Sequence, residues 1–421
     1  MANEDGAIRQ GQQQRTDARH DPRLNWFRDD KFGLFIHWGL YAIPAGVWKE
    51  EHIPGIGEWI MLRARVPVAE YAQLARQFNP TGFDAAAYVA LAKAAGMKYL
   101  VITAKHHDGF CMYDSNVTDY DIVDATPFGR DPLKELSAEC ARQGIKFGFY
   151  YSQTQDWHHP NGDGNDWDYV EDEKDFAGYI EHYVKPQVRE LLTNYGPICL
   201  VWFDTPKRIT EEQSRSLVDL VHELQPDCLV NGRIGNGLGD YAESRDNVIP
   251  GEELDADWET PATINDTWGF KTHDHNWKTP EDLIRKLVDI TSKGGTYLLN
   301  VGPTAQGIIP QPSVERLHAV GEWLARNGEA VYGTRPGPLQ GAEEYRSTQR
   351  PGKLYLHVFH WPADGVIHIA NLAQSVTGAH LLADAGHAAL RVEQRGSAVT
   401  VYGPAQVPDA ADTVIVLEMP A

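Results

Sequence analysis

The segment at residues 99–108 constrains the fold more than any other part of the chain. Its apolar run, residues 100–102, is typical of a strand that is buried on both faces. Lys105, His106, His107 and Asp108 follow where such a strand would end. Parallel α/β barrels carry their chemistry at the carboxyl ends of the strands, because the loops there form one open face. The run therefore predicts a polar pocket at a strand end.

Five further segments combine an apolar run with polar or aromatic side chains at its end. These side chains are His37 and Trp38; Tyr150, Tyr151 and Ser152; Trp202 and Asp204; Asn231 and Arg233; and Asn300. Segments with helical spacing lie between them, at residues 84–95, 131–143, 172–194, 210–224 and 280–292. Strands that alternate with helices indicate a parallel sheet. We therefore expect an α/β fold, with a barrel as the leading architecture.

Composition and hydrophobic periodicity divide the chain into three parts. Residues 1–22 are rich in Gln, Arg, Asp and Gly, which predicts a polar N-terminal tail. The strand and helix patterns then continue, so we expect the barrel to occupy residues 23–336. Beyond residue 336 helical spacing stops, and short alternating runs are separated by Gly, Pro, Asp and Ala. This pattern predicts an antiparallel β-sandwich over residues 337–421.

Charge and hydropathy exclude several kinds of partner. The net charge of −21 argues against nucleic acid or an anionic membrane as a main partner. The sequence has no stretch of about eighteen apolar residues, so it does not predict a transmembrane helix. The polar tail lacks the apolar core of a signal peptide, so we expect a cytoplasmic protein; a homo-oligomer is left open. Four scattered cysteines are expected to be free thiols: Cys111, Cys140, Cys199 and Cys228.

Aromatic side chains are concentrated around the predicted strand ends, although we expect about half of them to be core residues that take no part in binding. They are Trp38, Trp48, Trp59, Tyr150, Tyr151, Trp157, Trp202, Trp258 and Trp268. One face of a sugar ring stacks on an aromatic ring, while its hydroxyl groups need fixed donors and acceptors. A pocket of Trp, His and carboxylate side chains therefore favours a carbohydrate.

The histidines also allow a metal site, made of His37, His106, His107 and Asp108. Neighbouring side chains point to opposite sides of a strand, so His106 and His107 cannot both ligate one ion unless the strand has ended. The chain has no HExxH motif and no cysteine ligand set. A metal-dependent hydrolase is therefore the less favoured alternative.

Hydrolysis of a glycoside without a metal needs two carboxyl groups across the scissile bond. Asp204 is favoured as the nucleophile, because it ends a buried strand directly after Trp202 and Phe203. Its other common role, capping a helix, does not apply because the next helical pattern begins near Thr210. The second carboxyl is expected in an acidic segment whose other charges are solvated: Asp240, Glu243, Asp246, Glu252, Glu253, Asp255, Asp257 and Glu259.

Together these motifs resemble the family 29 glycoside hydrolases, the retaining α-L-fucosidases. The resemblance runs from about residue 26 to residue 335, and its motifs stand in the family's order. They include KFGLFIHWG at 31–39, GEW at 57–59, TAKHHDGF at 103–110, FGFYYS at 147–152, WFD at 202–204, WET at 258–260, WGF at 268–270, LLNVGPT at 298–304 and NGEAVYGTR at 327–335. The family's irregular (β/α)8-like, TIM-type barrel with a C-terminal antiparallel β-sandwich agrees with the predicted architecture.

The resemblance implies an exo-acting α-L-fucosidase that hydrolyses terminal α-L-fucosides of oligosaccharides or glycoconjugates with retention. Asp204 would be the nucleophile, and Trp59 and Trp202 would form apolar walls. Six side chains would hold the hydroxyl groups and ring of fucose: His37, Glu58, His106, His107, Tyr150 and Arg233. The resemblance implies no metal and no other cofactor. A barrel that binds fucosylated glycans without turnover is the alternative from another class.

The proton donor is not fixed by the resemblance, because its position shifts among members of the family. Glu259 in the WET motif and Asp246 in the preceding loop are the main candidates, and Glu243 is a third. Glu259 is slightly favoured, because Trp258 beside it could desolvate it and raise its pKa, whereas Arg245 beside Asp246 would lower the pKa of that residue.

Overall fold

Eight parallel strands form the central sheet of the structure, a computed structural model that describes residues 21–339 and 344–420. The strands are β1 (Phe32–Ile36), β4 (Tyr99–Lys105), β5 (Lys146–Ser152), β6 (Leu200–Asp204), β7 (Leu229–Val230), β8 (Ala242–Glu243), β9 (Trp258–Thr263) and β10 (Thr296–Val301). They are neighbours in this order, and β10 pairs with β1. An isolated parallel bridge between Asn231 and Tyr241 links β7 to β8, so the sheet closes into a barrel. The predicted α/β barrel is confirmed.

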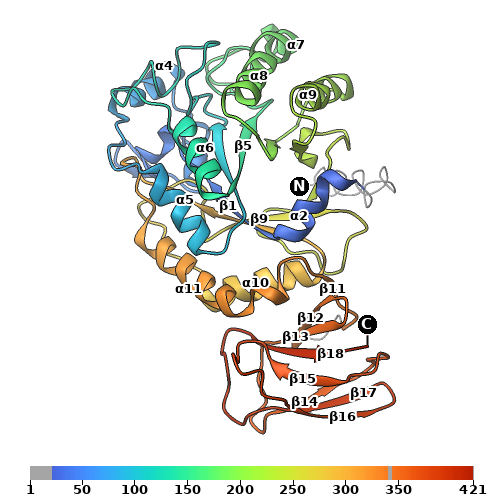
Figure 1. Ribbon diagram of the computed structural model, residues 1–421. Helices are drawn as coiled ribbons and strands as arrows, with labels where there is room; N and C mark the ends of the chain where they lie inside the picture. The colour runs from blue at the N-terminus through green and yellow to red at the C-terminus, as the bar shows by residue number, and fades with distance from the viewer. Residues whose placement is uncertain (1–20, 340–343, 421) are drawn as a thin grey trace.

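Helices cover the outside of the barrel (Figure 1). The longer ones are α5 (Ala85–Ala94), α6 (Pro132–Gln143), α8 (Lys185–Asn194), α9 (Glu211–Leu224), α10 (Pro280–Ser292) and α11 (Gln311–Asn327). Short elements complete the loops: α2 (Asn25–Asp30), β2 (Val47–Trp48), β3 (Glu51–His52), α3 (Ile60–Arg63), α4 (Val68–Tyr71) and α7 (Phe176–Tyr179). In the described part of the chain no α-helix separates β7 from β8 or β8 from β9, so the barrel is irregular.

The predicted helices begin where side chains can satisfy the first backbone N–H groups. Asp84, Asp131, Thr210 and Thr279 each accept a hydrogen bond from the first turn of α5, α6, α9 and α10, respectively. Each of these helices then lies between two strands of the barrel and buries an apolar face. Local sequence and packing therefore agree for this part of the fold.

The interior of the barrel is filled by its own apolar cluster. The members are Leu24, Phe27, Phe35, Tyr99, Val101, Tyr150, Leu200, Trp202, Leu229, Tyr241, Trp268 and Leu298. Gly33 in β1 is required there, because a Cβ atom at this position would lie 2.3 Å from the Tyr99 ring. The absence of that atom gives the Tyr99 side chain room inside the barrel, where its hydroxyl reaches Glu259 of β9.

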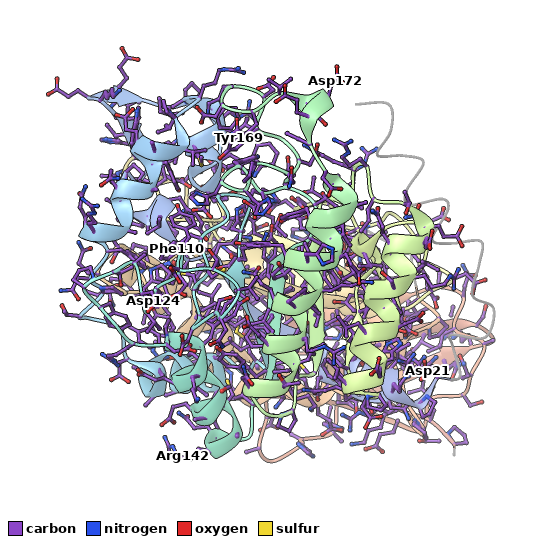
Figure 2. All side chains as sticks on the ribbon, turned by 90° about the horizontal axis from the view of Figure 1, so that it is seen from above. Asp21, Phe110, Asp124, Arg142, Tyr169 and Asp172 are labelled. Carbon is purple, nitrogen blue, oxygen red and sulfur yellow. The ribbon has the colours of Figure 1, made fainter. Side chains whose placement is uncertain are left out.

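The barrel has one closed end and one end lined by the loops that follow the strands. Tyr169 and Asp172, between β5 and α7, lie at one end, and Arg142 of α6 and Asp21 lie toward the other (Figure 2). The N-terminal residues Leu24 and Phe27 join the interior cluster, so they close the second end. Catalytic residues of such barrels lie at the first end.

An antiparallel β-sandwich follows the barrel and packs against α10 and α11 (Figure 1). One sheet has the order β11 (Arg335–Pro336), β12 (Tyr345–Arg350), β13 (Lys353–Val358), β18 (Thr413–Glu418), β15 (Gly378–Leu381), and the other β14 (Val366–Ile369), β17 (Ala398–Tyr402), β16 (Arg391–Arg395). The Arg285 side chain of α10 donates to the carbonyl groups of Phe359, Ala410 and Ala411, which fixes the sandwich on the barrel. The predicted sandwich is confirmed.

Some expectations concern the ends of the chain or its surroundings. Residues 1–20 of the predicted polar tail lie outside the described residues. All four cysteines lie inside them and are unpaired, as expected. Within residues 21–339 and 344–420, no helix is both long and apolar enough to cross a membrane.

Candidate active site

Asp204, the last residue of β6, is a carboxylate at the open end of the barrel with several polar contacts. Its Oδ2 atom accepts a hydrogen bond of 2.9 Å from the Tyr150 hydroxyl and lies 3.6 Å from Nε2 of His107. Its Oδ1 atom accepts from Nη1 of Arg233 at 3.0 Å and from the Thr205 N–H at 2.9 Å. Burial alone would raise the pKa of Asp204, but the charge of Arg233 and the hydrogen bonds from Arg233 and Tyr150 hold it below its usual value. Asp204 is therefore ionised.

The backbone directly after Asp204 is strained. Thr205 has φ of 52°, a left-handed conformation that a β-branched residue rarely adopts. The Thr154 hydroxyl donates to the Thr205 carbonyl at 2.5 Å and holds it in place. This conformation turns the Thr205 N–H back onto the Asp204 carboxylate, and such strain typically costs about 1–3 kcal/mol. Strain of this kind is typical of functional sites.

Three neutral histidines line the opposite side of the site. His37 follows β1, and His106 and His107 follow β4, which ends at Lys105. Because the strand has ended, the rings of His106 and His107 lie together, with centroids 4.2 Å apart. Burial lowers the pKa of His37 to about 4, that of His107 to about 3 and that of His106 well below its usual value. All three are therefore uncharged at neutral pH.

Hydrogen bonds to the ring nitrogens leave specific atoms of the histidines for a ligand. His37 donates from Nδ1 to Oδ1 of Asn300 at 2.7 Å, because this amide oxygen can only accept. His107 donates from Nδ1 to the Ser152 hydroxyl at 2.6 Å, and this hydroxyl donates onward to the Gln155 carbonyl. Nε2 of both rings is therefore an acceptor. Nδ1 of His106 is buried without a protein partner.

Glu58 is a buried carboxyl on a 3-10 turn (Gly57–Trp59). Its Oε2 atom accepts from the Gly269 N–H at 2.9 Å and from Oγ1 of Thr267 at 3.4 Å, whereas Oε1 has no protein partner. Burial raises the pKa of Glu58 to about 7. A carboxyl with one unpaired oxygen and a raised pKa can both donate to and accept from a hydroxyl group.

Aromatic rings form the walls of the site. The Tyr150 ring lies between those of His106 and Trp202 and is stacked on both, with centroid distances of 5.1 and 5.6 Å. The Arg233 guanidinium lies 4.8 Å from the centroid of the Trp202 ring. Trp59 contacts the His107 ring edge-on at 5.5 Å. The structure thus brings the predicted aromatic residues Tyr150, Trp59 and Trp202 together with the histidines.

The predicted proton donors occupy three different environments. Glu259 is fully buried near the start of β9, where its carboxyl accepts from the Tyr99 hydroxyl at 2.6 Å and from Nε1 of Trp202 at 2.8 Å. Burial raises its pKa to about 7. Asp246 follows β8, its side chain is 44% exposed, and it pairs with Nη2 of Arg233. Of the two, only Asp246 is open to solvent.

Glu243, the third carboxyl, ends β8 and is the register partner of Glu259 in the parallel ladder. Burial raises its pKa to about 8, against the opposing effect of the nearby Arg233, and its Oε1 atom has no protein partner. Glu243 therefore carries a proton at neutral pH.

Two polar residues of the segment at residues 99–108 do not belong to the site. Lys105 is buried and donates from Nζ to Asp156 at 2.9 Å and to the Tyr179 hydroxyl at 2.8 Å. Asp108 accepts from the Tyr71 hydroxyl at 3.0 Å. These bonds brace the loop that carries the two histidines. Of this run, only His106 and His107 lie beside Tyr150 at the strand end, whereas Lys105 and Asp108 have other partners.

Sequence reasoning missed Gln153, which directly follows β5. Its amide is fully buried and contacts the backbone of both Asp204 and Arg233. Its position one residue after a predicted strand end was the only signal in the sequence. In the described part of the chain, no group of three or more His, Cys, Asp or Glu side chains is arranged to hold a metal ion.

A barrel whose open end combines an ionised carboxylate, a second carboxyl group and aromatic walls defines a glycoside hydrolase. Comparison with known proteins gives the family: the alpha-L-fucosidase profile matches residues 2–329. Tissue alpha-L-fucosidase from Rattus norvegicus is 33% identical over 380 residues, which cover 84% of this chain and 79% of the rat protein. The chain belongs to the alpha-L-fucosidase family, as its motifs indicated.

Solved structures of the family share both fold and sequence with this chain. Alpha-L-fucosidase isoenzyme 1 from Paenibacillus thiaminolyticus is 38% identical with a TM-score of 0.87, and the match covers 96% of this chain and 100% of that chain. An alpha-L-fucosidase from Lactobacillus casei, solved in complex with the alpha-L-fucose product, is 44% identical with a TM-score of 0.67. That match covers 72% of this chain and 99% of the other.

Proposed function

We propose that this alpha-L-fucosidase acts at the ends of glycans and releases L-fucose with net retention, with Asp204 as the nucleophile. The observation that carries the proposal is the environment of Asp204. Arg233, Tyr150 and the Thr205 N–H keep its carboxylate ionised and oriented at the open end of the barrel. In a retaining glycosidase, such a carboxylate attacks the anomeric carbon and forms a covalent glycosyl-enzyme.

The proton donor that the geometry favours is Asp246 rather than Glu259. Arg233 contacts Asp204 through Nη1 and Asp246 through Nη2, so one guanidinium lies against both carboxyl groups. This arrangement is compatible with the separation of about 5–5.5 Å that retaining enzymes need. Glu259, in contrast, is closed off from solvent, and both of its oxygen atoms are occupied by Tyr99 and Trp202. We assign to Glu259 the role of holding the Trp202 wall from inside the barrel.

In this mechanism the protonated form of Asp246 donates its proton to the leaving oxygen while the Asp204 carboxylate attacks the anomeric carbon, which leaves Asp246 as a carboxylate. Asp246 then removes a proton from the water that hydrolyses the fucosyl-enzyme, as microscopic reversibility requires. The neutral His37, His106 and His107 and the carboxyl of Glu58 would bind the fucose hydroxyl groups, with Trp59 and Trp202 against the apolar parts of the sugar. The bound product of the Lactobacillus casei relative supports fucose as the sugar in this pocket.

The stereochemistry of the first product tests the mechanism. We expect that NMR spectra recorded during hydrolysis of an aryl α-L-fucoside show α-L-fucose first, followed by mutarotation. First appearance of β-L-fucose would contradict the retaining mechanism and the role of Asp204 in it. Binding of fucosides without any turnover would contradict catalysis and favour a glycan-binding barrel.

A further inference from the structure

The ends of β6 and β7, which carry the catalytic ion pair, are poorly connected by main-chain hydrogen bonds. The ladder between these strands pairs only Leu200 with Leu229 and Val201 with Val230. Asp204 and Arg233 each lie three residues beyond the last of these pairs. The relative position of the two residues therefore depends on interactions other than the regular ladder.

Asn231 supplies the first of these interactions. Its Oδ1 atom accepts from the Phe203 N–H at 2.7 Å, and its Nδ2 atom donates to the Phe203 carbonyl at 2.9 Å. One side-chain amide thus replaces the two main-chain groups that a longer β7 would present. It fixes the residue that directly precedes Asp204.

Gln153 supplies the second. Its Oε1 atom accepts from the Asp204 N–H at 2.9 Å, and its Nε2 atom donates to the Arg233 carbonyl at 2.8 Å. The side chain is fully buried, so water cannot replace either bond. Because an amide is rigid and planar, these two bonds set the distance between the backbones of Asp204 and Arg233.

We propose that Gln153 is a positioning residue that holds the Asp204–Arg233 ion pair in its reactive geometry. The inference rests on the proposed function, because it takes Asp204 as the nucleophile. A shift of about 1 Å in a reacting group can lower a rate by about 100-fold. Loss of the amide also loosens Arg233, whose charge keeps the Asp204 carboxylate ionised. Gln153 should therefore affect both the rate and its dependence on pH.

The main variant is Gln153→Met, which keeps the approximate volume and removes both hydrogen bonds. We expect kcat for an aryl α-L-fucoside to fall about 30–100-fold with a much smaller change in KM. The acidic limb of the kcat/KM profile should move to higher pH, because a loosened Arg233 stabilises the Asp204 carboxylate less. A kcat within threefold of the wild type and an unmoved limb would overturn the proposal.

Gln187→Met is the matched control. Gln187 is also fully buried, and its amide accepts from the Tyr151 hydroxyl at 2.6 Å and donates to Cys111 Sγ at 3.2 Å. It contacts neither Asp204 nor Arg233. We expect a comparable loss of thermal stability, with kcat within threefold of the wild type and an unchanged profile. An equal fall of kcat in both variants would show that Gln153 acts only through general stability, and would overturn the proposal.

Gln153→Glu gives a second signature that a structural role does not produce. When protonated, the introduced carboxyl group can still accept from the Asp204 N–H and donate to the Arg233 carbonyl, whereas its ionised form repels that carbonyl. We expect the activity of this variant, relative to the wild type at the same pH, to rise as pH falls from 8 to 5. A constant ratio would count against positioning by the amide.

Covalent labelling separates this inference from the proposed function. A 2-deoxy-2-fluoro-fucosyl fluoride should label Asp204 of the wild type, as seen by peptide mass spectrometry, and should label Gln153→Met more slowly. A label on another residue would overturn the proposed function and this inference with it. A label on Asp204 that forms at the same rate in both proteins would overturn this inference alone.

Discussion

The two halves of the open end of the barrel differ in charge. The half built on β6, β7 and β8 carries Asp204, Arg233 and Asp246, whose charges are paired within a few ångströms. The half built on β1 and β4 carries His37, His106 and His107, all of which have lost their charge through burial. In the proposed mechanism, the charged half is where bonds are made and broken, and the neutral half binds the sugar through directional hydrogen bonds.

The comparison of the two halves shows that a buried site can offer many hydrogen-bonding groups without holding uncompensated charges. Neutral imidazoles bind hydroxyl groups without attracting ions, and the large desolvation penalty of a buried charge is avoided. Asp204 escapes this penalty because a cation, a phenol and a backbone N–H compensate it. The two halves should therefore respond differently to mutation and to pH.

The largest effect is expected in the charged half, for Asp204→Gly. Loss of the proposed nucleophile should lower kcat at least about 1,000-fold, equal to about 4 kcal/mol of transition-state stabilisation. Azide should occupy the space of the missing carboxylate and restore part of the turnover of an aryl fucoside. His37→Ala, in the neutral half, is the control, and azide should not restore it. Retention of more than a few per cent of wild-type kcat by Asp204→Gly would assign the nucleophile elsewhere.

The next largest effect separates Asp246 from Glu259. Asp246→Ala should slow the cleavage of a sugar or alkyl leaving group about 100- to 10,000-fold and that of an activated aryl group far less, because the latter needs little protonation. Glu259→Ala should slow both substrates alike and lower Tm, because the Tyr99 hydroxyl and the Trp202 N–H lose their acceptor. Leaving-group selectivity in Glu259→Ala instead would return the role of proton donor to that residue.

A smaller effect is expected for the pH profile of Arg233→Met. The pKa of Asp204 lies below its usual value partly because of Arg233, so removal of the cation should raise this pKa. The nucleophile is then protonated at higher pH, and the acidic limb of kcat/KM should move up by about one unit. His107→Phe, which removes a neutral neighbour, should move this limb less. An equal movement in both variants would show that the charge of Arg233 is not the cause.

The smallest effect concerns the neutral half. The pKa values of His37 and His107 lie near 4 and 3, so neither residue should titrate between pH 5 and 8. Glu58, with a pKa of about 7, should titrate within this range. Bound fucose displaces water from this carboxyl and favours its neutral form, so the inhibition constant of L-fucose should rise about threefold as pH increases through 7. The nearly isosteric Glu58→Gln should abolish this dependence; its persistence would assign the titration to another group.

The sequence predicts the barrel best where local patterns and packing agree. β4, β5 and β6 have apolar runs that end in polar residues, and the intervening helices carry side-chain caps. The sequence does not predict β8 and β9, and most of the acidic residues there are expected to be solvated charges of a loop. β8 has only two residues, and β9 contains Pro261 and no long apolar run. These strands form only because their neighbours in the closed sheet provide the missing partners.

The same limit applies to individual side chains of the site. Motifs correctly indicate that His37, His106, His107, Tyr150 and Arg233 gather around Asp204. The environment of Glu259 could not be predicted, because alternation along β9 places Trp258 in the cluster outside the sheet and Glu259 inside the barrel. The preference for Glu259 assumed that Trp258 would desolvate it, whereas its neighbours are Tyr99 and Trp202, distant in sequence.

The barrel closes between β7 and β8, where one parallel bridge pairs Asn231 with Tyr241. We call this junction the seam, and it is where the closed sheet should open most easily. Among the described residues, seven of the eight junctions between neighbouring strands are ladders of two or more residue pairs, and the eighth joins two strands of two residues each. Amide hydrogens beside the seam should accordingly exchange with solvent sooner than those of β4 or β5. Since Arg233 follows β7 and Asp246 follows β8, a transient opening of this junction would separate these two charged side chains first and leave the other strand pairs intact.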